Sequence, residues 1–370
     1  MVVVARNRSL PMLMLLVLTL ATACLRQSAT TTPLADRDLE NGALRPYGDY
    51  SSKDLSSLDL SQAGAVLATI TFDNYTAWPR GSRMPKEFSP TRLLAWGKAP
   101  GLGVGKLHQQ GIAGKGVSVA FVDQPLPLNH KGLKGIGLTY TKVRLTPGES
   151  DESSYHGPPV ASLLAGREIG VAPGVKLYYY AHPPWLHDQS THADALRAVI
   201  QQNRALPEGQ KIRCVGFSDS PDPKEKNVEA YQAAIAEAEA EGILVVDVLR
   251  PVRLAPAGIQ PLANKEEPKN WRLSGWGKEL AGPGRLLVPA DGRTTAADGL
   301  QDDTVAYFAQ GGLSWSVPYV VGTLALGWQV DPGLTNQNAA LYLMESATPV
   351  EGGVLINPPG FVELVRTNKR

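Results

Sequence analysis

The stretch Gly311-Gly-Leu-Ser-Trp-Ser-Val-Pro-Tyr-Val-Val-Gly322, which continues into the apolar segment Thr323-Leu-Ala-Leu-Gly-Trp-Gln-Val330, decides the fold of this chain. Glycines precede Ser314 and the apolar residues after it recur at helical spacing, so we expect Ser314 at or just before a helix N-terminus. Backbone N–H groups at a helix start can stabilise an oxyanion, provided that a base elsewhere takes the hydroxyl proton. The stretch alone is also typical of a serine that only caps a buried helix.

Two earlier segments favour the nucleophile. The short apolar strand Gly116-Val-Ser-Val-Ala-Phe-Val-Asp123 ends on a carboxylate. The segment Tyr155-His-Gly-Pro-Pro-Val-Ala-Ser-Leu-Leu-Ala-Gly166 places His156 just before a helix of small residues. The chain therefore carries an aspartate, a histidine and a serine, in that order, each at the end of a secondary-structure element.

These segments resemble the three signature blocks of the subtilisin-like serine peptidases, the subtilases, whose residues also follow the order Asp, His, Ser. The resemblance covers roughly residues 101 to 350. It assigns Ser314 as the nucleophile rather than Ser316, because Pro318 lies four residues after Ser314, as in the family block.

The resemblance implies an α/β fold of three layers, with a mostly parallel central sheet flanked by helices. It implies a serine endopeptidase in which Ser314 attacks a peptide carbonyl, His156 moves the proton and Asp123 orients the imidazole. No metal or organic cofactor is needed. The segment Val215, Gly216, Phe217 and Ser218 corresponds to the strand edge that pairs with an extended peptide substrate in the family.

The apolar pattern after Val117 agrees with this fold. We expect strands at 117–122, 175–181, 212–217 and 243–248, with helices at 193–205 and 226–241. Such alternation is typical of a parallel sheet covered by helices, whose site lies at the carboxyl ends of the strands.

The chain departs from the family where an asparagine normally completes the oxyanion hole. The segment reads Gly242-Ile-Leu-Val-Val-Asp-Val-Leu-Arg-Pro251 and contains no asparagine. Arg250, Asn264 and Asn270 are the candidate replacement donors, and we favour Arg250 because a cation would stabilise the developing charge. A catalytically inactive relative that binds peptides or a partner protein remains the alternative.

The N-terminus is typical of a bacterial lipoprotein signal. Arg6 and Arg8 precede an apolar run, and Ala21-Thr-Ala-Cys24 forms a small-residue site that ends on cysteine. We expect residues 1–23 to be removed, Cys24 to be lipidated and the protein to be exported and held at the cell envelope membrane. A plain signal peptide or a single anchor helix is the alternative.

The remaining sequence predicts three further regions. Residues 24–54 are polar and suit a flexible tether, residues 55–105 read as an N-terminal extension, and residues 106–370 as the peptidase domain. Within the extension we expect a strand at 65–72 and a short helix at 91–96. A propeptide is the competing interpretation of the extension.

The composition and net charge limit the classes of binding partner that we expect. A hydrophobic fraction of 43% with 19% charged residues is ordinary for a globular protein, and a net charge of +1 gives no electrostatic reason to bind nucleic acid. The expected partners are a peptide or protein substrate and the membrane. The sequence leaves the oligomeric state open.

Two other groups of residues have side chains that could bind a metal ion or react. His182, His187, Asp188 and His192 lie close in sequence, but their spacing and the Pro183-Pro184 pair do not fit a metal site, so we expect none. Cys214 lies in an apolar run and reads as a small buried hydrophobic residue.

Overall fold

The computed structural model describes residues 30–145, 154–280 and 282–369. The expected signal segment 1–23 and the lipidation site Cys24 lie outside the described residues. Among the helices of the described ranges, none has both the length and the apolar character required to cross a bilayer.

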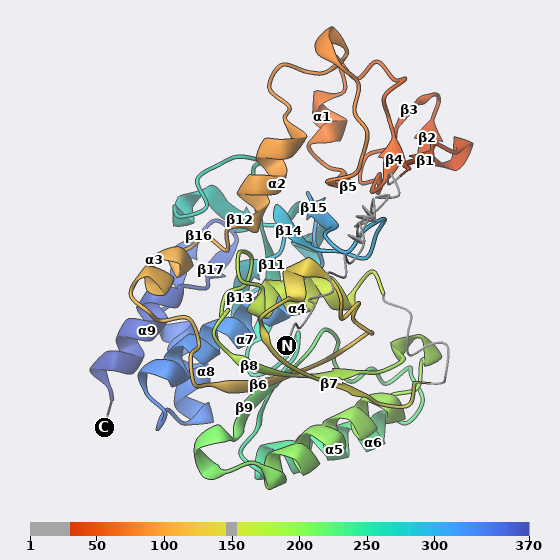
Figure 1. The fold of residues 1–370 in the computed structure, drawn as a ribbon. Helices are drawn as coiled ribbons and strands as arrows, with labels where there is room; N and C mark the ends of the chain where they lie inside the picture. The colour runs from red at the N-terminus through yellow and green to blue at the C-terminus, as the bar shows by residue number, and fades with distance from the viewer. Residues whose placement is uncertain (1–29, 146–153, 281, 370) are drawn as a thin grey trace, which may run out of the picture.

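A five-stranded, entirely parallel sheet forms the centre of the main body, by which we mean the chain after residue 105 (Figure 1). Its inner strands are buried on both faces, which explains why they read as continuous apolar runs. The spatial order is β10 (Leu244–Val246), β9 (Ile212–Phe217), β6 (Ser118–Asp123), β8 (Lys176–Ala181) and β7 (Gly137–Lys142).

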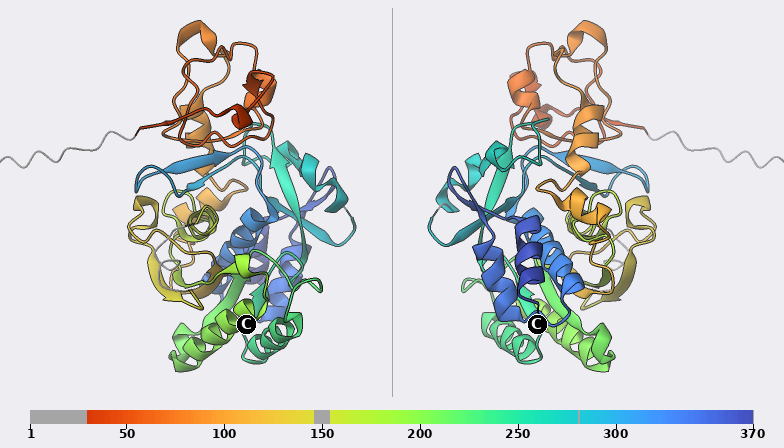
Figure 2. Two further views of the ribbon diagram at one scale, coloured as in Figure 1. Left: turned by 90° about the vertical axis from the view of Figure 1, so that its right-hand side faces the viewer. Right: turned by 90° about the vertical axis from the view of Figure 1, so that its left-hand side faces the viewer.

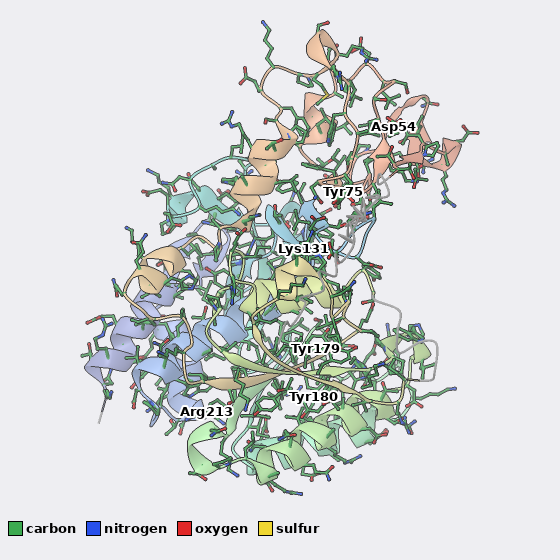
Figure 3. All side chains as sticks on the ribbon, viewed as in Figure 1. Asp54, Tyr75, Lys131, Tyr179, Tyr180 and Arg213 are labelled. Atoms are coloured by element: carbon green, nitrogen blue, oxygen red, sulfur yellow. The ribbon has the colours of Figure 1, made fainter. Side chains whose placement is uncertain are left out.

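Helices cover both faces of this sheet, because alternate strand residues point to opposite sides. On β8, Tyr179 packs into the core cluster shared with α4 (Gly157–Ala165) and α7 (Leu313–Val330), whereas Tyr180 packs toward α5 (Ser190–Ala205) and α6 (Val228–Ala240). Figure 3 labels the two tyrosines on this strand. The predicted three-layer α/β fold is confirmed.

The strands and helices predicted after residue 117 form close to their expected limits. Helix α5 begins three residues earlier than predicted, at Ser190, and β10 ends at Val246 and not at residue 248. The early end of β10 bears on the site. The reason is local: the carboxylate of Asp247 accepts hydrogen bonds from the backbone N–H groups of Leu249 and Arg250, and these bonds turn the chain out of the sheet.

Two smaller sheets and several short elements complete the main body. One sheet has the order β12-β11-β13-β17-β16, and the other has the order β14-β15-β5. The strands are β11 (Arg253–Ile259), β12 (Trp271–Leu273), β13 (Arg285–Pro289), β14 (Arg293–Ala296), β15 (Val305–Phe308), β16 (Thr348–Val350) and β17 (Gly353–Leu355), and the helices are α3 (Val104–Gln109), α8 (Asn336–Glu345) and α9 (Pro358–Thr367).

The N-terminal extension has a small core of its own and stands at one end of the main body in both views of Figure 2. It nevertheless shares a sheet with that body, since β5 (Thr71–Asp73) pairs antiparallel with β15. The hydroxyl of Tyr75 donates a hydrogen bond to Asp303, which also pairs with Lys131 (Figure 3). Strand pairing and these polar contacts fasten the extension directly ahead of the Ser314 helix.

Helix α2 (Pro90–Lys98) adds a tight contact between the extension and the main body. A Cβ atom at Gly97 would lie 2.2 Å from Oγ1 of Thr294 on β14, so only glycine permits this approach. Next to it, the buried Nζ of Lys265 donates to the carbonyls of Gly97 and Ala99 at the end of α2. The predicted helix at 91–96 thus forms, with a residue or two added at each end.

Two predictions for the N-terminal region are corrected. Residues 32–54, expected within the tether, form the short strands β1 (Thr32–Pro33), β2 (Leu39–Glu40), β3 (Ala43–Leu44) and β4 (Lys53–Asp54). They are anchored by the buried side chains of Leu44 and Tyr50, and strands of two residues are too short to give a periodic pattern. The expected strand at 65–72 instead begins as helix α1 (Gly64–Leu67).

Candidate active site

Asp123 occupies the carboxyl end of the central strand β6, where parallel sheets place their functional groups. Its buried carboxylate is fully engaged. Oδ1 lies 2.7 Å from Nδ1 of His156 and accepts the backbone N–H of Gln124, while Oδ2 accepts the hydroxyl of Ser218 at 2.7 Å. This network fixes the carboxylate in a single orientation toward the imidazole.

His156 is the N-cap residue of α4, so the helix start determines where its ring lies. Pro158 and Pro159 fall in the first turn, where a missing N–H costs nothing. The hydroxyl of Ser154 accepts the backbone N–H groups of His156 and Gly157. Pro158 and Pro159 are therefore compatible with the position of the imidazole.

The electrostatics of this pair suit a general base. Burial acts to raise the pKa of Asp123, but the charge of His156 and the hydrogen bonds from His156, Ser218 and Gln124 outweigh it and hold the pKa below its usual value. Burial acts to lower the pKa of His156, but the charge and hydrogen bond of Asp123, with a smaller contribution from Asp219, raise it above the usual value.

Ser314 is the second residue of α7, two residues after the N-cap Gly312. At this position the backbone N–H has no acceptor inside the helix, as an oxyanion donor requires. Pro318 lies four residues after Ser314 and has no backbone N–H. The carbonyl of Ser314 therefore lacks the usual helical hydrogen bond from residue 318. The side chain of Ser314 is partly exposed.

Ser316 has a different environment from Ser314. Its side chain is completely buried, and its hydroxyl donates to the carbonyl of Val288 at 3.2 Å. Reagents and substrates cannot reach it without opening the core. The structure thus distinguishes the two serines in the way the sequence predicted.

Ser314 and His156 line one small pocket of about 180 Å³. No hydrogen bond joins the two side chains within the described structure, a looseness that is common in sites without substrate. The pocket is lined by Val122, Asp123, Gln124, Tyr155, His156, His182, Pro184, Ser218, Asp219 and Ser314. Three chain segments far apart in sequence thus bring the predicted Asp, His and Ser to one cavity.

The predicted side-chain donors for the oxyanion are not at this pocket. The guanidinium of Arg250 lies 2.8 Å from Oδ2 of the buried Asp247, where it serves to compensate that carboxylate. Asn270 donates to the carbonyl of Asn264, and Asn264 accepts the backbone N–H of Glu266, which ties both asparagines into the connection between β11 and β12. This corrects the prediction for Arg250, Asn264 and Asn270 and leaves the backbone N–H of Ser314 as the candidate donor.

The predicted substrate-binding edge also needs correction. Val215 and Gly216 are paired with β6 on one side and with β10 on the other, so the backbone groups of these two residues belong to the interior of the sheet. Among the described strands Phe217 pairs with β6 alone, and the side chains of Val215 and Phe217 are buried. Of the four residues, only Ser218 lines the pocket, and its hydroxyl is held by Asp123.

The histidine-rich segment does not assemble as a ligand set. His182 and His192 are buried with their ring centroids 4.4 Å apart, whereas His187 is exposed and pairs with Glu225. Across the ranges that the structure describes, no three His, Cys, Asp or Glu side chains gather as metal ligands would. Cys214 is buried in the core, and burial raises the pKa of its thiol.

Sequence reasoning missed two residues that shape the site. Asp291 accepts the backbone N–H of Gly311 at 3.0 Å, the indole N–H of Trp276 and the hydroxyl of Ser274, and so braces the loop ahead of Ser314. Asp219 projects into the pocket from the loop after β9. Asp219 directly follows the segment Val215–Ser218, which the resemblance assigns to substrate binding, and Asp291 begins an Asp-Gly turn, but neither signal shows the role of the side chain.

Comparisons with solved structures agree with this architecture. The A-subunit of the AB5 toxin from E. coli matches with a TM-score of 0.53 at 18% identity, covering 73% of this chain and 99% of the toxin chain. The PatG macrocyclase domain matches with a TM-score of 0.50 at 16% identity, covering 72% of this chain and 95% of that domain. At these identities the likeness shows the fold alone.

The sequence comparisons match a smaller part of the chain than the structural comparisons do. No curated protein matches the chain. The profile of the family described as Subtilase family matches residues 114–247, which include Asp123 and His156. Together with the shared fold, this match confirms the predicted resemblance: residues 114–247 of the chain are similar to the subtilase family.

Proposed function

We propose that the protein is a serine endopeptidase that hydrolyses peptide bonds through Asp123, His156 and Ser314. One observation carries the proposal: the Asp123–His156 hydrogen bond of 2.7 Å opens onto the same pocket as Ser314 at the start of α7. The match to the subtilase profile and the fold shared with the PatG macrocyclase, which has been solved in complex with peptide, support a peptide as the ligand.

Each of these three residues has a defined role in the hydrolysis reaction. The Ser314 hydroxyl attacks the scissile carbonyl while Nε2 of His156 accepts its proton, and the same imidazole then protonates the leaving amine. Asp123 holds the ring through Nδ1 and stabilises the imidazolium that forms. The backbone N–H of Ser314 donates to the oxyanion. Water then releases the acyl group by the same steps in reverse order.

Attachment to the cell envelope is the second part of the proposal. It rests on the sequence before Cys24, which suits export, cleavage and lipidation. Globomycin, an inhibitor of lipoprotein signal cleavage, should make the unprocessed chain accumulate in an expressing bacterium. Cys24→Ala should release the protein from the membrane fraction, and its continued presence there would contradict lipid anchoring at this residue.

A catalytically inactive, peptide-binding protein is the second candidate. A specific observation favours it: among the described residues of the pocket lining, Gln124 is the one asparagine, glutamine, lysine or arginine. Loss of one oxyanion donor costs about 10²–10³-fold in kcat. A protein with such a loss still reacts with strong serine electrophiles if its triad is intact.

A fluorophosphonate probe with mass mapping separates the two candidates. The peptidase proposal expects a stoichiometric adduct on Ser314, none in Ser314→Ala, and full labelling in Ser316→Ala, the matched control. Hydrolysis of a casein-derived peptide by the parent protein should fall to the background rate in Ser314→Ala. An adduct elsewhere, or full hydrolysis by purified Ser314→Ala, would refute the assignment.

A further inference from the structure

Among the described residues that line the Ser314 pocket, Asp219 is the one accessible carboxylate, since the other, Asp123, is buried and hydrogen-bonded to His156 and Ser218. It follows Ser218 directly, and its side chain is 52% exposed. Its field reaches the catalytic histidine, because its charge contributes to raising the pKa of His156. Asp219 therefore lies close enough to act on a group bound beside Ser314.

A buried histidine holds this carboxylate. Nε2 of His192 lies 3.1 and 3.0 Å from the two oxygens of Asp219. The imidazole is packed among the rings of His182, Phe217 and Tyr231, so it cannot swing away. Nδ1 is buried without a hydrogen-bond partner in the described structure, so Nε2 is the ring atom that holds Asp219. Asp219 is thus preorganised.

Within the part of the chain that the structure describes, neither lysine nor arginine pairs with Asp219, and neither is among the described residues that line the pocket. Besides its polar groups, the described lining includes Tyr155, Pro184 and Val122. A fixed carboxylate in a pocket that also contains apolar groups fits a long side chain with an apolar stem and a cationic end.

We propose that Asp219 is a specificity residue that binds a lysine or arginine side chain of the peptide lying across Ser314. The inference rests on the proposed function, because it requires a peptide in this pocket, and it adds the chemical class of one substrate residue. A charge-assisted hydrogen bond at a half-buried carboxylate favours the cationic peptide over an isosteric neutral one by about tenfold or more.

The test measures binding rather than turnover, so that it does not depend on catalytic activity. Ser314→Ala protein is titrated with fluorescent octapeptides in which one position at a time carries lysine, norleucine or glutamate, and Kd is read from anisotropy. At one position we expect lysine to bind about tenfold more tightly than norleucine, and glutamate to bind most weakly. When Asp219→Asn is introduced into the Ser314→Ala protein, the preference for lysine at that position should be lost.

A matched control is Asp222→Asn, which removes an exposed carboxylate three residues away that does not line the pocket. It should retain the lysine preference, and thermal unfolding of both variants checks that they fold. Peptides that bind without any lysine preference, or a preference that survives Asp219→Asn, would overturn the inference and leave the peptidase proposal standing. If no peptide binds and no fluorophosphonate adduct forms, the proposed function fails together with the inference.

Discussion

Two histidine–carboxylate pairs contribute side chains to the pocket, His156 with Asp123 and Asp219 with the buried His192 behind it, and they are built in opposite ways. In the first, the Asp123 side chain is 4% exposed and that of His156 is 15% exposed. In the second, the histidine is hidden, with 3% of His192 exposed against 52% of Asp219. Each pair therefore presents a different partner to the pocket: an imidazole in one and a carboxylate in the other.

This difference assigns a role to each pair on physical grounds. A buried carboxylate that is saturated by hydrogen bonds cannot bind a ligand, but it orients the accessible ring and favours its protonated form. A buried imidazole cannot exchange protons with a substrate, but it can fix an accessible carboxylate. Burial, more than residue identity, thus separates the group that reacts from the group that positions it.

The largest expected effect comes from breaking the first pair. Asp123→Asn preserves the shape of the buried site but loses the charge and holds the imidazole in the wrong tautomer, so we expect kcat to fall by about 10⁴-fold. The loss should be the same for lysine-containing and norleucine-containing peptides, because Asp123 does not touch the substrate side chain. Stopped assays of purified protein over several hours can measure this residual rate.

Asp219→Asn provides the contrast. It should lower kcat/KM for the lysine peptide by about tenfold, mainly through KM, because it removes binding in the ground state and the transition state alike. If Asp219→Asn lowered kcat by as much as Asp123→Asn, the two pairs would not have separate roles and the comparison would fail.

Much of this arrangement was predictable because it depends on local patterns. Strands buried on both faces give apolar runs, and the ends of such strands and helices place Asp123, His156 and Ser314 at one edge of the sheet. The distinction between Ser314 and Ser316 also follows from helix position, because two residues separate the exposed first turn from the buried face.

The rest depends on contacts between distant residues. Whether Val215 has a free edge depends on β10, which the sequence cannot pair with β9 in advance. Arg250 appears free in sequence, but in the structure it compensates Asp247. Asp219 gives no pattern at all, since its role comes from His192, which lies one helix earlier in the chain.

A smaller effect should appear in the pH dependence of hydrolysis. His156 must be neutral to accept the serine proton, so kcat/KM should rise with pH through the pKa of His156, which is raised above its usual value. The Asp219 charge contributes to that increase. In Asp219→Asn the pKa of His156 should fall and the rising limb should move to lower pH.

The measurement uses the norleucine peptide, whose side chain has no charge, and two salt concentrations. Because Asp219 is half exposed, the displacement between wild type and Asp219→Asn should shrink as salt increases. In Asp222→Asn, kcat/KM should rise over the same pH range as in the wild type. If the rise in kcat/KM stayed at the same pH or moved to higher pH in Asp219→Asn, this would show that the two pairs are not electrostatically coupled.

The smallest expected effect comes from releasing Asp219 without removing it. His192→Phe keeps an aromatic ring against Phe217 and Tyr231 but removes the donor to Asp219. The substitution also removes the buried, unpartnered Nδ1, which offsets the lost hydrogen bond, so the variant should remain folded. Because the freed carboxylate must be ordered again by each ligand, we expect Kd for the lysine peptide to rise by only about threefold to fivefold.

The control for this prediction is Glu225→Gln, which breaks the exposed pair with His187 and should leave Kd unchanged. Anisotropy titrations in the Ser314→Ala background compare the three proteins directly. A loss in His192→Phe as large as that in Asp219→Asn would mean that the imidazole itself contacts the ligand. An unchanged Kd would mean that solvent orders Asp219 as well as the buried histidine does, so the second pair would owe its function to the carboxylate alone.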